Sequence, residues 1–115
     1  MPPYKRSERL GELLLAELSG LLAREIKDPR IGFVTLTRVD MSDDLRYAKV
    51  FASIIGSAPE KVRTLQGLSS ATGYMRRHLG RALHLRYTPE ITFLLDESLE
   101  YGAKIAQLLH QLPPG

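Results

Sequence analysis

The feature that most limits how this chain can fold is an interruption in an amphipathic pattern, "LSSATGYMRRHLGRAL", residues 68–83. Small and polar residues that suit a helix interior poorly fill positions 69–73. Apolar residues at helical spacing stand on both sides of this gap. We therefore predict a core helix from about Pro59 to Leu83 that is broken at Ala71-Thr72-Gly73. Its apolar positions are Val62, Leu65, Leu68, Met75, Leu79, Ala82 and Leu83.

The remaining pattern predicts two further helices and three strands. Residues 33–41 and 45–55 are rich in β-branched or alternating apolar residues and flank a short polar turn, so they should form an antiparallel hairpin. A third strand is expected at 90–95. The first helix should cover about 7–26 and the last 98–112. Their expected inner positions are Leu10, Leu13, Leu14, Leu18, Leu21, Leu22 and Ile26 in the first, and Leu99, Ile105, Leu108, Leu109 and Leu112 in the last.

This order of elements predicts an α+β fold, in which a three-stranded mixed sheet carries helices on one face. The third strand returns after a helical connection, which favours parallel pairing. The length of 115 residues suits one domain, and 43% hydrophobic residues can supply its core. We expect a single domain over residues 1–115, with an ordered core at about 4–110 and a short tail at 113–115.

The charge of the chain is unevenly distributed. The net charge is only +3, but residues 61–89 contain no Asp or Glu and carry +6. The other ten basic residues face thirteen acidic ones, a net charge of −3. A basic segment on a neutral-to-acidic body is typical of proteins that bind polyanions, although a solvated helix face would look similar.

Part of this basic segment falls on one side of the broken helix. At 100° per residue, Arg77, Gly80, Arg81 and His84 lie on the same side as Arg76. Glycine in mid-helix costs about 1 kcal/mol relative to Ala, so Gly80 indicates the close approach of a bulky ligand or of another helix. The bidentate guanidinium suits phosphate. The predicted RNA-binding residues are Arg76, Arg77, Arg81, His84, Lys61, Arg63 and Arg86, and the helix-break motif is Ser70, Ala71, Thr72 and Gly73.

The sequence shows no residue pattern typical of an enzyme active site. There is no Cys, and the three His residues lack the spacing of metal ligands. Ser69 and Ser70 do not stand in a nucleophile motif, and Asp43 and Asp44 are adjacent in a predicted turn. We predict no catalytic residue, no metal and no cofactor. No apolar run reaches the length of about 18 residues that spans a bilayer, so we expect a cytoplasmic protein without a membrane partner.

A helix, a break, a second helix and a strand, in this order, resemble the centre of a KH domain. There a Gly-x-x-Gly loop lets a nucleic-acid backbone approach closely. Here the pattern is Ala71-Thr72-Gly73, without the first Gly. Three segments strengthen the likeness: "KDPRIGFVTLTRVDMSDDLRYAKVFASIIG", "SATGYMRRHLGRAL" and "LRYTPEITFLLDES". In this order and spacing the chain resembles the ribosome-binding factor A family over about residues 4–110.

The resemblance implies a type II KH-like fold with Ala-x-Gly in place of Gly-x-x-Gly. It also implies a non-enzymatic, monomeric factor that binds ribosomal RNA on the free small ribosomal subunit during late maturation, alongside other assembly factors, and matters most in the cold. A protein–protein adaptor without direct RNA contact is the alternative. We further expect that Gly73→Val would weaken subunit binding more than folding, with a stability loss of about 1 kcal/mol.

Overall fold

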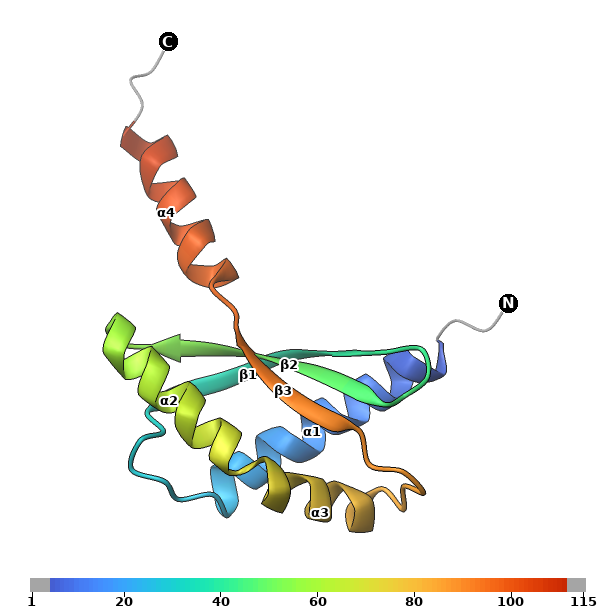
Figure 1. Cartoon of the computed structure of the whole chain (residues 1–115). Coiled ribbons are helices and arrows are strands. Elements are labelled where there is room, and N and C mark those ends of the chain that lie inside the picture. Colours follow the sequence, from blue (N-terminus) through green and yellow to red (C-terminus); the bar gives the residue numbers. More distant parts are fainter. Residues whose placement is uncertain (1–4, 112–115) are drawn as a thin grey trace.

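The computed structural model describes residues 5–111, apart from the side chains of residues 99–103. Three helices and a sheet form a layered body, from which a fourth helix extends (Figure 1). This arrangement confirms the α+β prediction. The elements are α1 (Arg6–Arg24), β1 (Phe33–Met41), β2 (Tyr47–Ile55), α2 (Ala58–Ser70), α3 (Thr72–Ala82), β3 (Glu90–Leu95) and α4 (Ser98–Gln111).

The sheet has the order β1-β2-β3, with β2 in the centre. β1 pairs with β2 antiparallel, and the register shifts between Leu36 and Arg38 at a bulge. β2 pairs with β3 parallel, which places Tyr47 opposite Glu90. The predicted hairpin and the predicted parallel return are therefore both confirmed.

Helices α1, α2 and α3 cover one face of this sheet (Figure 1). Alternate residues of β2 point into the layer between sheet and helices, as period-two patterning requires. Fully burying an aliphatic side chain contributes about 1.5–3 kcal/mol, so this layer supplies most of the stabilisation. The buried core consists of Leu14, Leu18, Leu21, Leu36, Ala48, Val50, Ala52, Ile54, Leu68, Met75, Leu79 and Phe93.

Three residues that we predicted to face the core are exposed instead: Leu13, Val62 and Ala82. Each lies at the border of an apolar stripe, where helical spacing alone does not decide which side the helix buries. Gly67, which carries no apolar side chain, is buried. A Cβ at this position would lie 2.7 Å from Cγ1 of Ile31, so glycine permits the close approach of α2 to the segment before β1.

The predicted break is confirmed and is narrow, because Ala71 alone separates α2 from α3. The start of α2 is fixed by a capping box. The Ser57 hydroxyl accepts from the backbone N–H of Glu60, and the Glu60 carboxylate accepts from the backbone N–H of Ser57.

The prediction that α4 would bury an apolar side is wrong. Ile105, Leu108 and Leu109 are 38%, 56% and 63% exposed. α4 extends away from the sheet and the other helices (Figure 1). Its apolar periodicity predicts a helix, but the other described elements leave Ile105, Leu108 and Leu109 uncovered. The other two expected inner positions, Leu99 and Leu112, lie outside the described side chains, as does the tail at 113–115.

Across residues 5–111, none of the helices has the length and apolar character needed to cross a membrane.

Candidate nucleic-acid interface

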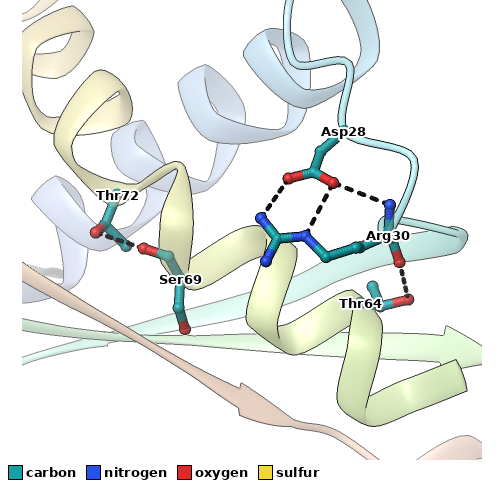
Figure 2. Close-up of polar contacts among 5 residues, drawn as sticks. All are labelled: Asp28, Arg30, Thr64, Ser69 and Thr72. Atoms are coloured by element: carbon teal, nitrogen blue, oxygen red, sulfur yellow. Dashed lines mark hydrogen bonds and ion pairs between the residues drawn. The ribbon is translucent and has the colours of Figure 1, made fainter. Parts of the chain in front are cut away.

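The break leaves the N-terminus of α3 without a side-chain cap. Its N-cap residue is Ala71, which has no side-chain acceptor, and the first turn of α3 contains no acidic residue. The Thr72 hydroxyl donates instead to the backbone carbonyl of Ser69, at 2.8 Å (Figure 2). Helix N-termini carry free N–H groups and a partial positive charge. The start of α3 can therefore accept an anion.

Gly73 is exposed and lies within the first turn of α3. A Cβ there would meet only a terminal nitrogen of Arg77, at 3.8 Å, which is ordinary contact. Its φ is not positive. The backbone conformation therefore does not by itself penalise a side chain at this position. The fold tolerates a larger residue here, and glycine leaves the backbone of the break open.

The loop between α1 and β1 is bonded to the middle of α2. The Arg30 guanidinium and backbone N–H both donate to the Asp28 carboxylate (Figure 2). These bonds lower the pKa of Asp28 to about 2. The Thr64 hydroxyl, which is buried in α2, donates to the Arg30 carbonyl at 3.3 Å and accepts from the N–H of Gly32 at 3.2 Å.

Arg77 and Arg81, two of the predicted RNA-binding residues, lie on the exposed side of α3. Both are exposed, and neither forms an ion pair or a hydrogen bond with another described residue. They border a shallow hollow of about 280 Å³ on the surface of α3, together with Gly80. Two like charges one turn apart repel each other, and a phosphate between them would relieve this repulsion.

Arg76 has a structural role that the sequence did not indicate. Its guanidinium donates to the carbonyl of Pro89 at 3.1 Å and to that of Thr88 at 3.0 Å. It therefore ties α3 to the segment that leads into β3. Gly80 serves the same junction, since a Cβ there would lie 3.1 Å from the Thr88 hydroxyl. The close neighbour of Gly80 is thus a loop of the same chain.

The other predicted residues are spread more widely. His84 is exposed just after α3, with φ of 52°, and Arg86 is exposed in the next segment. Lys61 and Arg63 lie in the first turns of α2, at the end far from the break (Figure 1). The Lys61 ammonium lies 3.9 Å from the Glu97 carboxylate. The structure therefore brings Arg77, Arg81 and the break together, and leaves Lys61 and Arg63 apart from them.

Two contacts that join α3 to α1 were not predicted. The Tyr74 hydroxyl donates to the Glu25 carboxylate at 2.6 Å, which raises the pKa of Tyr74. Nε2 of His78 lies 3.0 Å from the Glu17 carboxylate. The two partners lie 49 residues apart in the first contact and 61 in the second, so no local sequence pattern could predict either contact. Within the part of the chain that the structure describes, no group of His, Asp or Glu is arranged to hold a metal.

Comparison with known proteins gives consistent matches. The family model described as "Ribosome-binding factor A" matches residues 6–109. The Ribosome-binding factor A of Halothermothrix orenii is 51% identical over 94% of this chain and 88% of its own length. A solution NMR structure of a Thermotoga maritima protein is 35% identical, with a TM-score of 0.75 over 87% of this chain and 95% of that one.

A third match carries information about a complex. It is a homology model of the Thermus thermophilus ribosome binding factor A, fitted into a cryo-EM map of a 30S–RbfA complex. It is 28% identical, with a TM-score of 0.56 over 74% of this chain and 93% of that one. The interrupted helix, the mixed sheet and these matches agree, and the chain belongs to the ribosome-binding factor A family.

Proposed function

We propose that this chain is a maturation factor that binds the free small ribosomal subunit through its ribosomal RNA. The observation that carries the proposal is the family membership, together with a related chain whose description places it in a 30S complex. The geometry of α3 supports it. An uncapped helix N-terminus and two unpaired arginines lie on one exposed surface, as the binding of an RNA backbone requires.

Within this surface the residues have different roles. Arg77 and Arg81 contact phosphates, and the break from Ser70 to Gly73 lets the RNA backbone approach α3. Arg76 is exposed but positions the segment after α3 through its two carbonyl partners. His84 and Arg86 extend the contact along this segment. Lys61 and Arg63 lie at the outer limit of the RNA footprint.

The proposed activity is binding alone, without a chemical step, a metal or a cofactor. We propose that the protein acts in the cytoplasm as a monomer and meets other assembly factors on the subunit. The greater need for such a factor in the cold, which the family resemblance implies, is a prediction for growth of a deletion strain at low temperature.

The decisive experiment is co-sedimentation of the protein with purified free small subunits over a series of salt concentrations. Binding to RNA releases counterions, so the logarithm of the affinity should fall linearly with the logarithm of salt concentration. An affinity that barely responds to salt would contradict the proposal.

One observation favours the adaptor alternative. Phe33 and Ile55 are paired in the sheet register, and both are exposed. An apolar contact through these residues would respond little to salt. Phe33→Ser with Ile55→Ser would then abolish subunit binding, whereas RNA binding through α3 predicts that this double variant binds as the parent does.

A further inference from the structure

The tripeptide Leu-Arg-Tyr occurs twice in the chain, at 45–47, where its Tyr begins β2, and at 85–87, shortly before β3. β2 and β3 run parallel and are neighbours, so both tripeptides meet at the same end of the sheet. The backbone N–H of Glu90 donates to the carbonyl of Arg46 at 2.8 Å and fixes this register. Two Arg–Tyr pairs that lie forty residues apart in sequence thus border one groove.

This groove, which we name the two-tyrosine groove, has a volume of about 780 Å³. Ligand sites typically measure about 300–1,000 Å³, so it has room for one or two nucleotides. Its walls come from the start of α1, the turn between β1 and β2, and the segment between α3 and β3. The lining residues used below are Arg6, Arg46, Tyr47, Arg86, Tyr87 and Glu90.

The two tyrosines have no role in the core. Tyr47 is 55% exposed and Tyr87 is 77% exposed, and neither hydroxyl has a hydrogen-bond partner among the described residues. The guanidinium carbon of Arg86 lies 5.6 Å from the centre of the Tyr87 ring. Exposed aromatic faces beside guanidinium groups are the combination that binds unpaired nucleotides, because every base has a face that stacks.

Four hydrogen bonds hold the walls of the groove in place without a ligand. Arg76 donates to the carbonyls of Thr88 and Pro89 and so fixes the segment that carries Tyr87. The Ser42 hydroxyl accepts from the backbone N–H groups of Arg46 and Tyr47 and so fixes the turn that carries Tyr47. The groove is therefore preformed, and a ligand loses little affinity to ordering it.

Charge around the groove favours an anionic ligand. Arg6, Arg46 and Arg86 are exposed there, against two carboxylates. One of these, Asp44, already accepts from the Ser42 hydroxyl and from the N–H of Arg46. The other, Glu90, would repel a phosphate but can accept a hydrogen bond from the amino group of a base. Phosphates therefore belong on the arginine side, and bases on the side of the tyrosines.

The groove also adjoins the arginine surface of α3. The hollow beside Arg77 and Arg81 shares Arg76, Leu85 and Thr88 with it. An RNA strand bound to α3 can thus continue into the groove if its bases are unpaired, since paired bases present no free face to a side chain.

We propose that the two-tyrosine groove binds one or two unpaired RNA nucleotides, with bases stacked on Tyr47 and Tyr87 and phosphates near Arg46 and Arg86. The source of this RNA, the small subunit, rests on the proposed function. The nucleotide chemistry of the groove stands on the two Arg–Tyr pairs alone.

The test uses the whole chain, a fluorescently labelled unpaired RNA of about eight nucleotides, and a hairpin of the same base composition. The variants are Tyr47→Leu and Tyr87→Leu, which keep an apolar side chain but remove the aromatic face. Stacking predicts that each lowers the affinity for the unpaired RNA about tenfold, with an unchanged dependence on salt. Tyr47→Phe and Tyr87→Phe should bind as the parent does, since the ring remains.

Phe33→Leu is the matched control, because Phe33 is also an exposed aromatic residue but lies on β1, outside the groove and away from α3. It should keep the affinity of the parent for the unpaired RNA. Arg86→Gln should weaken binding and reduce the slope of log affinity against log salt by roughly 0.7, the value for one phosphate contact on a single strand.

Two outcomes would overturn the proposal: equal affinity of the parent and both Leu variants for unpaired RNA, or equal loss for the hairpin and the unpaired RNA. A groove that served a protein partner would give the first of these outcomes. The titration contains no ribosomal subunit. It therefore tests whether the groove binds RNA even if co-sedimentation contradicts the proposed function. If the Leu variants lose affinity for the unpaired RNA but bind the subunit as the parent does, the groove binds RNA nucleotides, and the subunit is held by the arginine surface instead.

Discussion

Helices α3 and α4 are both amphipathic, but they present opposite sides to solvent. In α3, Met75 and Leu79 are completely buried, and the exposed side carries arginines. In α4, the described leucines and Ile105 are exposed, and the helix extends away from the sheet (Figure 1). Periodicity thus specifies that a helix forms and which side of it is apolar. Whether that side finds a partner depends on the rest of the chain.

The contrast also concerns how each helix is held. α3 is tied to α1 and its C-terminal end by His78 and Tyr74, and to the segment before β3 by Arg76. For α4 the described bonds lie at its start, where Asp96 accepts from the backbone N–H of Ser98. The basic surface of α3 therefore has a fixed orientation on the body, as a binding surface requires.

The largest effect on stability should come from shortening one apolar side chain in each helix to alanine. Met75→Ala removes a fully buried side chain and should lower the free energy of unfolding by about 2–5 kcal/mol. Leu108→Ala removes an exposed one and should change it by less than about 0.5 kcal/mol. Urea unfolding followed by circular dichroism measures both. A comparable loss in Leu108→Ala would mean that α4 packs against the body in solution.

Reversing charges on α3 should affect subunit binding, whereas reversing a charge on α4 should not. Arg77→Glu with Arg81→Glu should abolish co-sedimentation with small subunits, because two phosphate contacts become repulsions. Lys104→Glu, at an exposed position of α4, is the matched control and should bind as the parent does. Each single Arg→Ala variant should flatten the logarithmic salt slope by roughly 0.7–0.9. Unchanged slopes in both single variants would move the binding surface away from α3.

Gly73 offers a smaller and more specific change. Because its φ is not positive and a Cβ meets only ordinary contact, Gly73→Val and Gly73→Ala should each change stability by less than about 1 kcal/mol. Subunit affinity should nevertheless fall, more in Gly73→Val than in Gly73→Ala, if the RNA backbone approaches the break. Melting temperature and affinity are measured on the same sample. Parental affinity in Gly73→Val would show that the break is only structural.

Sequence reasoning was accurate where the determinants are local. The bounds of β1 and β3 and the break at Ala71 follow from alternation and from small residues, which act over a few positions. Arg77 and Arg81 were placed correctly on an exposed side of α3 for the same reason. Their contact with RNA stays a prediction.

What the sequence did not reveal depends on distant parts of the chain. Arg76 looks like its neighbour Arg77, and only the return of the chain at Thr88 and Pro89 gives it carbonyl partners. The two-tyrosine groove also depends on distant parts of the chain, because only the parallel pairing of β2 with β3 brings its two Arg–Tyr pairs together. The exposure of α4 could not be predicted from its own sequence. Leu108 belongs to the same helical pattern of apolar residues whether or not another element covers it.

The smallest predicted effect concerns the link between the sheet and α4. The Asp96 carboxylate accepts from the Thr37 hydroxyl at 2.6 Å and from the N–H of Ser98 at 2.9 Å. These bonds lower the pKa of Asp96 from 3.8 to about 2, with the Thr37 bond as the largest cause. A lowered pKa in the folded state stabilises the fold above the ordinary value, and this contribution is lost as the pH falls from about 4 to 2.

Thr37→Val removes the hydroxyl at similar size, so the pKa of Asp96 should rise toward its ordinary value. NMR titration of the carboxyl carbons measures this shift directly. Asp28 is an internal control, since its pKa is also about 2 but is lowered by Arg30, far from α4 in sequence. It should titrate unchanged in the variant. The stability difference between parent and variant should shrink as the pH approaches 2, because protonation of Asp96 then weakens in the parent the bond that the variant already lacks. An Asp96 pKa that stays at about 2 in Thr37→Val would mean that the bond to Ser98 alone holds the carboxylate, and that the start of α4, not the sheet, fixes this link.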